Sequence, residues 1–339
     1  MKIVADIKIP YLKGLLEPVA QEVAYIPASE IDRKVLRDAQ VLLTRTRTCC
    51  DQALLDGTAV EFIGTATIGT DHIDLGYCRS HGIDVVNAPG CNAPAVAQWV
   101  HATVLRWSAA HSVMRPLTLG IVGVGHVGSI VARWAQQLGY RVLLNDPPLE
   151  EQGVTPEDRG LKGLGFSTLS NLQRDCDIIT FHTPLTHEGK HPTWHLCDKA
   201  FVGGLRRCRL IVNAARGAVC DNMALLAWHG DVALDCWEGE PHVNRALLDK
   251  AFVATPHIAG YSLQGKQRGT AMVVEALNRR YGWDIKPVQA STPLGGARQV
   301  TAQRILDSYD PAIDTARLKA SPATFEQQRN NYRLRQEVE

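Results

Sequence analysis

TLGIVGVGHVGSIVARWAQQLGYRVLLND, residues 118–146, is the stretch that decides the fold. It begins with an apolar, strand-like run, Thr118–Val122, which leads into the glycine pattern GxGxxG. A helix-length segment follows, and a second apolar run, Arg141–Asn145, ends in Asp146. The glycine pattern alone would be weak evidence. Strand, glycine turn, helix, strand and acidic residue in this order form the complete context of a dinucleotide-binding unit.

The three glycines have different expected roles. Gly123 permits a tight turn, Gly125 lets the backbone approach a pyrophosphate, and Gly128 allows the helix to pack closely on the strand. The pyrophosphate would lie at the helix N-terminus, where backbone N–H groups point at it. Asp146 would accept hydrogen bonds from the ribose hydroxyls and repel a 2′-phosphate, so NAD is the expected cofactor.

In the rest of the chain, short β-branched runs alternate with helix-length segments. This alternation predicts a parallel α/β sheet with helices on both faces. The other expected strands are Val41–Thr44, Glu61–Ile63, Val85–Asn87, Ile178–Phe181, Leu210–Asn213, Val232–Asp235 and Phe252–Ala254. Long helices are expected over 94–111 and 126–139, a linker over 286–300, and partly helical structure over 301–339.

The bulk composition limits the possible functions. The 339 residues predict at least two domains. With 36 basic and 35 acidic residues, the chain has no net field that would favour nucleic acid or an anionic membrane. The nine cysteines are scattered without a CxxC pair, so neither a disulfide framework nor a metal site is expected. Without a signal-peptide pattern or an apolar stretch long enough to span a bilayer, the expected location is the cytoplasm.

Polar residues follow three of the expected strands, in the segments NAARG (213–217), LDCWEGEP (234–241) and TPHIAGY (255–261). Ligands bind at the carboxyl ends of strands in sheets of this type. His257 can remove a hydroxyl proton, and Glu240 can orient its ring. Arg216 offers the planar fork that binds a carboxylate. Together they predict oxidation of a 2-hydroxy acid.

The remaining cofactor contacts are expected at the same edge of the sheet. Asp235 could hold the nicotinamide carboxamide or cap its strand, and we favour the first interpretation. Thr183 follows another strand end and could touch the cofactor, whereas a packing role is favoured for the neighbouring His182. The further residues expected to contact NAD are His126, Val127, Ala215 and Gly260.

In combination, these motifs resemble the D-isomer-specific 2-hydroxyacid dehydrogenase family over about residues 1–285. The resemblance implies that Arg216, Glu240 and His257 are the catalytic trio. It also implies a Rossmann-type, doubly wound nucleotide-binding domain, a flavodoxin-like substrate domain and a short C-terminal segment. The implied division is 1–93 and 257–286 for the substrate domain, 94–256 for the NAD-binding domain, and 287–339 for a shortened dimerisation region of a homodimer.

Further motifs are similar to one branch of that family. They are FIGTATIGTDHID (62–74), APGCNA (88–93), NDPP (145–148), FHTPL (181–185) and PHIAGYSLQGK (256–266). Enzymes of this branch oxidise 4-phospho-D-erythronate to 2-oxo-3-hydroxy-4-phosphobutanoate with NAD during pyridoxal 5′-phosphate synthesis. The substrate-contacting positions that the resemblance implies are Thr46, Thr67 and Tyr261.

Three questions stay open from the sequence. Arg45, Arg47 and Lys266 could bind a substrate phosphate or be solvated surface charges. The substrate could instead be glycerate, hydroxypyruvate or 3-phosphoglycerate, as for other members of the family. The chain could also be a non-catalytic NAD(H)-sensing protein, although the intact set of Arg, Glu and His disfavours this reading.

Overall fold

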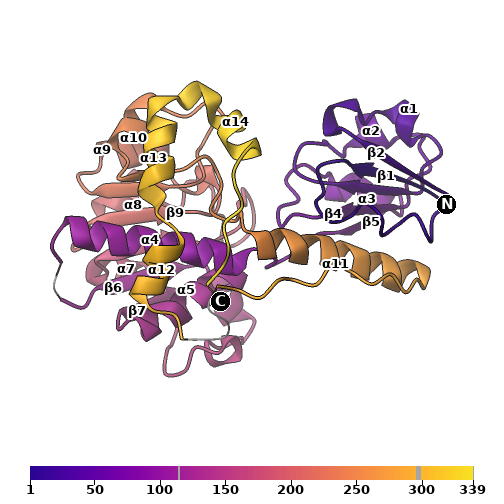
Figure 1. The fold of residues 1–339 in the computed structure, drawn as a ribbon. Helices are drawn as coiled ribbons and strands as arrows, with labels where there is room; N and C mark the ends of the chain where they lie inside the picture. Colours follow the sequence, from indigo (N-terminus) through magenta and orange to yellow (C-terminus); the bar gives the residue numbers. More distant parts are fainter. Residues whose placement is uncertain (114, 295–298, 339) are drawn as a thin grey trace. The chain divides into compact units, whose positions relative to one another are not determined.

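A computed structural model describes residues 1–113, 115–294 and 299–338. The chain divides into two compact units (Figure 1). The first contains Met1–Asn92 and Ser262–Thr292, and the second contains Ala93–Tyr261 and the described part of Pro293–Glu339. The chain therefore returns to the first unit at Ser262, five residues after the predicted position. The described residues of the predicted region 287–339 cluster with the second unit from Pro293 onward.

The first unit is built on a five-stranded parallel sheet in the order β2-β1-β3-β4-β5. This order is that of flavodoxin-like folds. The strands are β1 (Lys2–Asp6), β2 (Glu22–Ile26), β3 (Val41–Thr44), β4 (Phe62–Thr65) and β5 (Asp84–Val86). The helices are the short α1 (Arg33–Leu36), α2 (Gln52–Leu55) and α3 (Leu75–Ser80), and the long α11 (Leu263–Tyr281). Separate apolar cores fill the two faces of the sheet.

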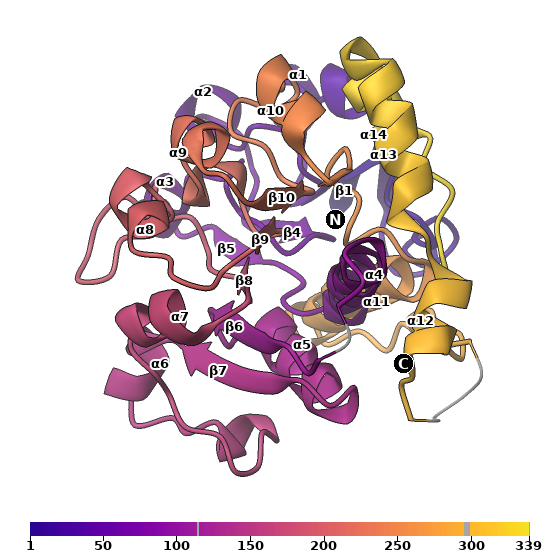
Figure 2. The ribbon, with the colours of Figure 1, turned by 90° about the vertical axis from the view of Figure 1, so that its left-hand side faces the viewer.

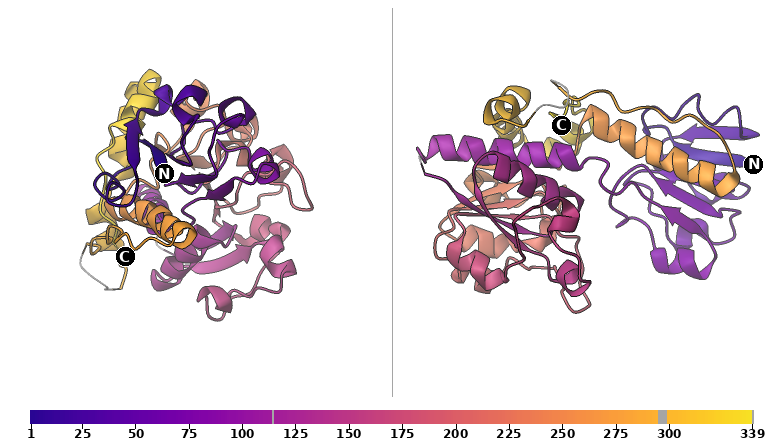
Figure 3. Two further views of the ribbon diagram at one scale, coloured as in Figure 1. Left: turned by 90° about the vertical axis from the view of Figure 1, so that its right-hand side faces the viewer. Right: turned by 90° about the horizontal axis from the view of Figure 1, so that it is seen from below.

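Helix α11 packs on this sheet through small and polar residues in its N-terminal half and through Val273, Val274, Ala276 and Leu277 in its C-terminal half. Its buried positions include Gln264, Gly265, Gln267, Gly269 and Thr270. A Cβ at Gly269 would lie 3.0 Å from the Ala66 carbonyl oxygen, so the missing side chain permits close approach. The helix appears in orange beside the strands of its own unit in the right-hand view of Figure 3.

The second unit contains a six-stranded parallel sheet in the order β11-β10-β9-β8-β6-β7. Its strands are β6 (Thr118–Val122), β7 (Arg141–Asn145), β8 (Ile178–Phe181), β9 (Leu210–Asn213), β10 (Asp231–Leu234) and β11 (Val253–Ala254). A parallel bridge between Leu144 and Phe166 adds one more pairing at β7. The chain moves from β6 to β7 on one side and then to β8 on the other. The switch point, where such sheets bind ligands, therefore lies between β6 and β8.

Helices cover both faces of this sheet (Figure 2). One core includes residues of α4 (Ala93–Ala110) and α5 (His126–Gln137). The opposite core includes residues of α7 (Leu169–Asp175), α8 (Lys199–Gly203), α9 (Asn222–Ala227) and α10 (Arg245–Lys250). Helix α6 (Pro147–Glu151) follows β7 directly. Among the described helices, none combines the length and apolar character needed to cross a bilayer.

The C-terminal segment packs on the second unit. Helix α12 (Ala302–Ser308) contacts α4, and α13 (Pro311–Ala320) lies along the edge strand β11. The Thr315 hydroxyl accepts the Ala254 N–H at 3.0 Å, which satisfies a donor on that strand. Helix α14 (Phe325–Asn330) buries Phe325 in the core beside α7 to α10. The segment therefore completes the core and covers the edge of the sheet.

The predicted fold class is confirmed: the chain is an α/β protein with a Rossmann-type sheet and a flavodoxin-like sheet. All nine predicted strands exist. Four of them, at residues 61–63, 85–87, 232–235 and 252–254, differ from the observed limits by one or two residues. Strand β2 and helix α11 were not predicted. The described residues of the expected linker 286–300 form neither helix nor strand, and 295–298 lie outside the described residues.

Candidate active site

The glycine turn has the geometry that its pattern predicts. Gly123 has φ +89°, which an L side chain would strain, and a Cβ there would meet the His182 backbone at 2.8 Å. A Cβ at Gly128 would lie 1.9 Å from the Gly123 carbonyl oxygen. Helix α5 can therefore approach β6 only because residue 128 has no side chain.

Open space surrounds the middle glycine. A Cβ at Gly125 would meet nothing within 4 Å, and Gly125 is the N-cap of α5 without a side-chain cap among the described residues. His126 is exposed and Val127 half-buried on the first turn. The N-terminus of this helix therefore offers backbone N–H groups and the positive end of the helix dipole, which suit an anion such as a diphosphate.

Asp146 ties the glycine turn to the next helix. One carboxylate oxygen accepts the Val124 N–H at 2.7 Å, and the other accepts the Leu149 N–H at 3.1 Å and caps α6. The side chain is half-buried. It therefore lies at the end of β7, beside the glycine turn, as the sequence predicts for a ribose-binding acid.

The switch point holds a buried polar group that the protein does not satisfy. The Thr183 hydroxyl, just after β8, has no hydrogen-bond partner among the described residues. A buried hydroxyl without a partner is costly and calls for an explanation such as a ligand. The neighbouring His182 contacts the Thr180 hydroxyl at 3.0 Å, and burial lowers its pKa to about 3. A neutral, buried ring agrees with the packing role expected for His182.

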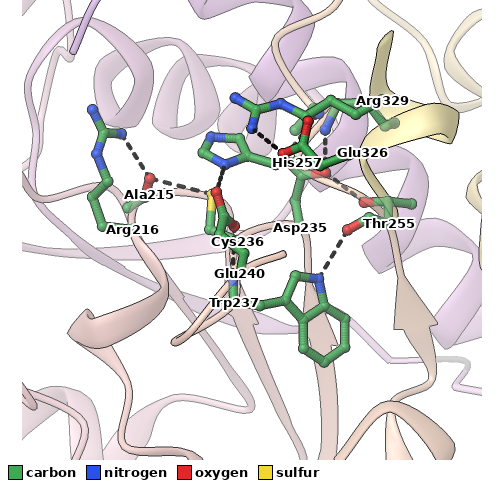
Figure 4. A network of polar contacts seen from close by, with 12 residues as sticks. Ala215, Arg216, Asp235, Cys236, Trp237, Glu240, Thr255, His257, Glu326 and Arg329 are labelled. Carbon is green, nitrogen blue, oxygen red and sulfur yellow. Dashed lines mark hydrogen bonds and ion pairs between the residues drawn. The ribbon is translucent and has the colours of Figure 1, made fainter. Parts of the chain in front are cut away.

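Glu240 and His257 form a direct pair (Figure 4). His257 Nδ1 lies 2.5 Å from the Glu240 carboxylate, and the Trp237 N–H donates to the same carboxylate at 3.1 Å. Burial opposes ionisation of Glu240, but the hydrogen bond and charge of His257 outweigh it and lower the pKa of this carboxyl. The pair leaves Nε2 as the ring nitrogen that does not face the carboxylate.

The backbone at His257 is held in an unusual conformation. Its φ is +55°, in the left-handed region that a residue with a side chain seldom adopts. The His257 N–H donates to the carbonyls of Asp235 at 2.8 Å and Thr255 at 3.0 Å. Such strain persists only where the surroundings determine it, and it clusters at functional sites.

Asp235 organises the loop that carries the histidine. Its two oxygens accept the N–H groups of Ile258 at 2.7 Å and Ala259 at 2.9 Å, and the Thr255 hydroxyl at 2.6 Å. Trp99 of α4 donates to that same hydroxyl at 3.1 Å. Burial raises the pKa of Asp235. This loop-organising role was not predicted, and the expected contact with nicotinamide stays a prediction.

Arg335, near the end of the chain, binds the opposite side of the loop. It is 8% exposed and donates to the carbonyls of Ile258 at 3.0 Å and Ala95 at 2.9 Å, and also to that of Ala259. Its guanidinium stacks over Tyr309, 4.5 Å from the ring centre. Residues 258 and 259 thus give their N–H groups to Asp235 and their carbonyls to Arg335. Sequence reasoning missed this residue because the polar C-terminal sequence around it resembles a solvated surface.

Arg216 lies at the carboxyl end of β9. The side chain is half-buried and donates to the Ala215 carbonyl at 2.9 Å, while the Ala215 N–H donates to Asn213 at 3.0 Å. A Cβ at Gly217 would lie 2.0 Å from the Trp237 backbone, so this segment packs tightly against the residues before Glu240. Arg216, Glu240 and His257 follow the neighbouring strands β9, β10 and β11 of one sheet, and Figure 4 shows their side chains.

The predicted substrate residues are divided between the two units. Thr46 and Thr67 follow the adjacent strands β3 and β4 of the first unit. Thr46 is exposed, and the Thr67 hydroxyl lies 2.7 Å from that of Thr65. Tyr261 belongs to the second unit, where its N–H donates to Ile258 at 2.8 Å. Gly260, one of the expected cofactor contacts, lies in that turn.

The three basic residues that the sequence offers for a substrate phosphate have protein partners. Arg45 donates to the Lys8 carbonyl at 3.3 Å, and Arg47 and Lys266 also interact with the protein. All three belong to the first unit. Binding of a phosphate by any of them stays a prediction.

One further polar cluster lies in the second unit. Potential ligand atoms of His195, Asp221 and Glu238 lie within 4.8 Å of one another. His195 already contacts Glu238 at 2.7 Å, and Asp221 caps α9 by accepting the Met223 N–H at 2.7 Å. These contacts satisfy the side chains as a structural network.

Comparisons with known proteins match both the second unit and the chain as a whole. Residues 92–259 match the NAD-binding domain of the D-isomer-specific 2-hydroxyacid dehydrogenases. The erythronate-4-phosphate dehydrogenase of Bacteroides thetaiotaomicron is 43% identical, over 99% of this chain and 97% of that protein. The protein of the same name from Porphyromonas gingivalis is 42% identical, over 98% and 92%.

Solved structures support the fold. D-lactate dehydrogenase from Aquifex aeolicus, complexed with NAD and lactic acid, superposes with a TM-score of 0.68 at 24% identity. The match covers 83% of this chain and 96% of that one.

Proposed function

The chain belongs to the D-isomer-specific 2-hydroxyacid dehydrogenase family and is an NAD-dependent dehydrogenase, and we propose that it oxidises 4-phospho-D-erythronate to 2-oxo-3-hydroxy-4-phosphobutanoate. The observation that carries this proposal is the Glu240–His257 pair at 2.5 Å, in a chain 42–43% identical to dehydrogenases named for that substrate. The reaction would serve pyridoxal 5′-phosphate synthesis in the cytoplasm, and the enzyme would act as a homodimer.

The acid–base step falls to His257. With Nδ1 on Glu240, the ring presents Nε2 to the 2-hydroxyl and accepts its proton as the hydride leaves carbon 2. Glu240 fixes the ring orientation and stabilises the imidazolium that forms. NAD, when bound, accepts the hydride. The Asp235 and Arg335 contacts hold the loop, so the imidazole needs little reorganisation during the reaction.

The substrate is assigned to four residues that are separate from the assigned cofactor residues. Arg216 would bind the substrate carboxylate through its fork and polarise the carbonyl oxygen in the reverse direction. Thr46, Thr67 and Tyr261 would contact the rest of the substrate.

NAD fits the second unit because the N-terminus of α5 lacks a side-chain cap among the described residues and the buried Thr183 hydroxyl is unsatisfied. The residues assigned to hold NAD are Gly123, Gly125, His126, Val127, Gly128, Asp146, Thr183, Ala215, Asp235 and Gly260.

A substrate screen tests the proposal. NADH formation is measured with 4-phospho-D-erythronate, 3-phosphoglycerate and D-glycerate, with a 2-oxo acid present to recycle the cofactor. Preference for phosphoerythronate supports the assignment, and preference for another acid keeps the mechanism but discards the substrate. Absence of turnover on all three, with NAD binding intact, would favour the sensing protein.

The role of His257 is tested in the same assay. His257→Ala should retain NAD binding and lose turnover by roughly 10²–10⁴-fold, the usual contribution of a general base. An unchanged rate would remove His257 from the mechanism. His242→Ala is the matched control, because His242 is exposed, lies in the same unit and is not assigned to the site.

A further inference from the structure

Arg329 brings a partly buried positive charge from the C-terminal segment to the predicted substrate residue Tyr261. It lies on α14, and its side chain is 16% exposed. Its Nε donates to the Tyr261 hydroxyl at 3.3 Å, and its Nη1 lies 3.5 Å from the Glu326 carboxylate one turn earlier. Tyr332, also from this segment, contacts the Tyr261 ring edge-on at 6.1 Å. The C-terminal segment therefore holds both the ring and the hydroxyl of Tyr261.

The same charge acts on the catalytic pair. Figure 4 shows the Arg329 guanidinium projecting toward the His257 and Glu240 side chains. The charged and titratable groups that interact with Glu240 in the described part of the chain include His257, Arg329 and the buried Cys236 thiol. Burial opposes ionisation of Glu240 and is the largest influence on its pKa. The hydrogen bond and charge of His257, the Trp237 N–H and, last, the charge of Arg329 all lower this pKa.

We propose that Arg329 is a positioning residue of the active site, which holds the Tyr261 hydroxyl and places a fixed positive charge beside the Glu240–His257 pair. The inference rests on the function proposed above. It extends the site to a part of the chain that the family's NAD-binding domain, residues 92–259, does not include. In this proposal Arg329 contacts neither the 2-hydroxyl group nor the carbon that loses the hydride. It acts through Tyr261 and Glu240.

The hydrogen bond determines how Tyr261 can meet a substrate. A phenol oxygen has one proton and two lone pairs. Because an Arg329 N–H occupies a lone pair, the phenol proton must point away from the guanidinium. The hydroxyl is thereby oriented as a donor, which is the polarity that a phosphate or carboxylate oxygen requires. An arginine keeps this orientation at every working pH because it stays protonated.

The test compares Arg329→Gln with Arg333→Gln, which removes the same charge from an exposed position four residues later. Loss of a charged hydrogen bond predicts a fall in kcat/KM of about tenfold to hundredfold for Arg329→Gln. The acidic limb of its pH profile should move to higher pH, because the Glu240 pKa rises without the positive charge. Arg333→Gln should match the wild type in both.

A conservative variant separates positioning from simple loss of structure. Arg329→Lys retains the charge, so its acidic limb should stay at the wild-type position while KM rises. In a double-mutant cycle, the KM effect of Arg329→Gln should largely disappear in a Tyr261→Phe background. The inference is overturned if Arg329→Gln has the KM and the pH profile of the wild type. It is also overturned if this variant has a lower melting temperature while the acidic limb of its pH profile does not move.

Failure of this inference can be told apart from failure of the proposed function. The profiles are measured with whichever D-2-hydroxy acid the wild-type enzyme oxidises, so a wrong substrate leaves the test intact. A wild-type enzyme without turnover refutes the function. If the wild type is active and Arg329→Gln matches it in KM and pH profile, only the inference is refuted.

Discussion

Replacing Arg335 with methionine should destabilise the protein and damage catalysis together. Arg335 donates to the carbonyls of Ala95, Ile258 and Ala259, and a more distant fourth acceptor, the Tyr261 carbonyl, lies at 3.4 Å. Methionine fills a similar volume but donates nothing. Several buried carbonyls would then lose a charged donor, each worth about 1.5–3 kcal/mol. Because water and local movement recover part of this, we expect a loss of about 3–5 kcal/mol.

The catalytic effect follows from where these carbonyls lie. Two of them belong to the residues that directly follow His257, whose backbone is strained at φ +55°. Without Arg335, the loop can relax toward an ordinary conformation and move the imidazole. A displacement of about 1 Å can cost about 10²-fold in rate, so kcat should fall by at least tenfold.

Urea denaturation and steady-state kinetics on the same preparations provide the assay. Arg333→Met is the matched control, because Arg333 is exposed and two residues away. It should retain the wild-type denaturation midpoint and kcat. If Arg335→Met had the same midpoint as Arg333→Met, the loop would not depend on the guanidinium and this reasoning would be wrong.

Three further predictions concern the pair and the glycine turn. Glu240→Gln should be less stable than the wild type at neutral pH. Because the folded-state pKa of Glu240 is depressed below its ordinary value of 4.5, this difference should shrink as pH falls below that value, and a constant difference in urea midpoints would contradict the assignment. Gly128→Ala should lower the free energy of unfolding by about 1–3 kcal/mol, because a Cβ would collide with the Gly123 carbonyl. Gly125→Ala should keep the wild-type melting temperature and weaken NAD binding, because a Cβ there meets no protein atom within 4 Å. If calorimetry and NAD titration gave the same result for both variants, the two glycines would not have these different roles. Asp146→Asn should narrow the preference for NAD over NADP because a neutral amide no longer repels the 2′-phosphate, and an unchanged ratio of kcat/KM for the two cofactors would argue against a ribose contact.

The sequence predicts the nucleotide-binding sheet well because local chemistry and global position agree there. Thr118–Val122 is buried on both faces and is followed by a glycine at φ +89°, so apolar run and turn residue indicate the same boundary. The predicted pairing of Glu240 with His257 also succeeds, because both follow strands of one parallel sheet. Residues at the carboxyl ends of such strands are brought together by the fold itself.

Helix α11 was not predicted, because its sequence pattern does not mark the face that the fold buries. Its N-terminal half buries Gln264, Gly265, Gln267 and Gly269, so no apolar stripe marks the buried face. Strand β2 was missed because Glu22–Ile26 is at most partly buried, and it pairs only at the edge of its sheet. Periodicity reports burial of apolar side chains, and neither β2 nor the N-terminal half of α11 buries large apolar side chains fully.

The contribution of the C-terminal segment could not be predicted because it depends on contacts between residues 68 to 77 positions apart. Arg335 meets carbonyls at 258 and 259, and Arg329 meets Tyr261, whereas the surrounding sequence is as polar as a solvated helix. A buried arginine is distinguished from a surface one only by its partners. For Arg335 those partners are mainly backbone carbonyls, which every sequence contains and no sequence pattern marks.

The peptide between Ile258 and Ala259 explains why two distant buried charges are needed. A trans peptide directs its N–H and C=O in opposite directions. Asp235 accepts the Ala259 N–H at 2.9 Å, and Arg335 donates to the Ile258 carbonyl at 3.0 Å, so both ends of this peptide are fixed. Removal of either charge would leave one end able to rotate. Leaving φ +55° would relieve backbone strain at the adjacent His257. Fixing only one end of the peptide would therefore not keep the imidazole on Glu240. The strained histidine therefore depends on the strand end at Asp235 and the C-terminal segment at Arg335 together.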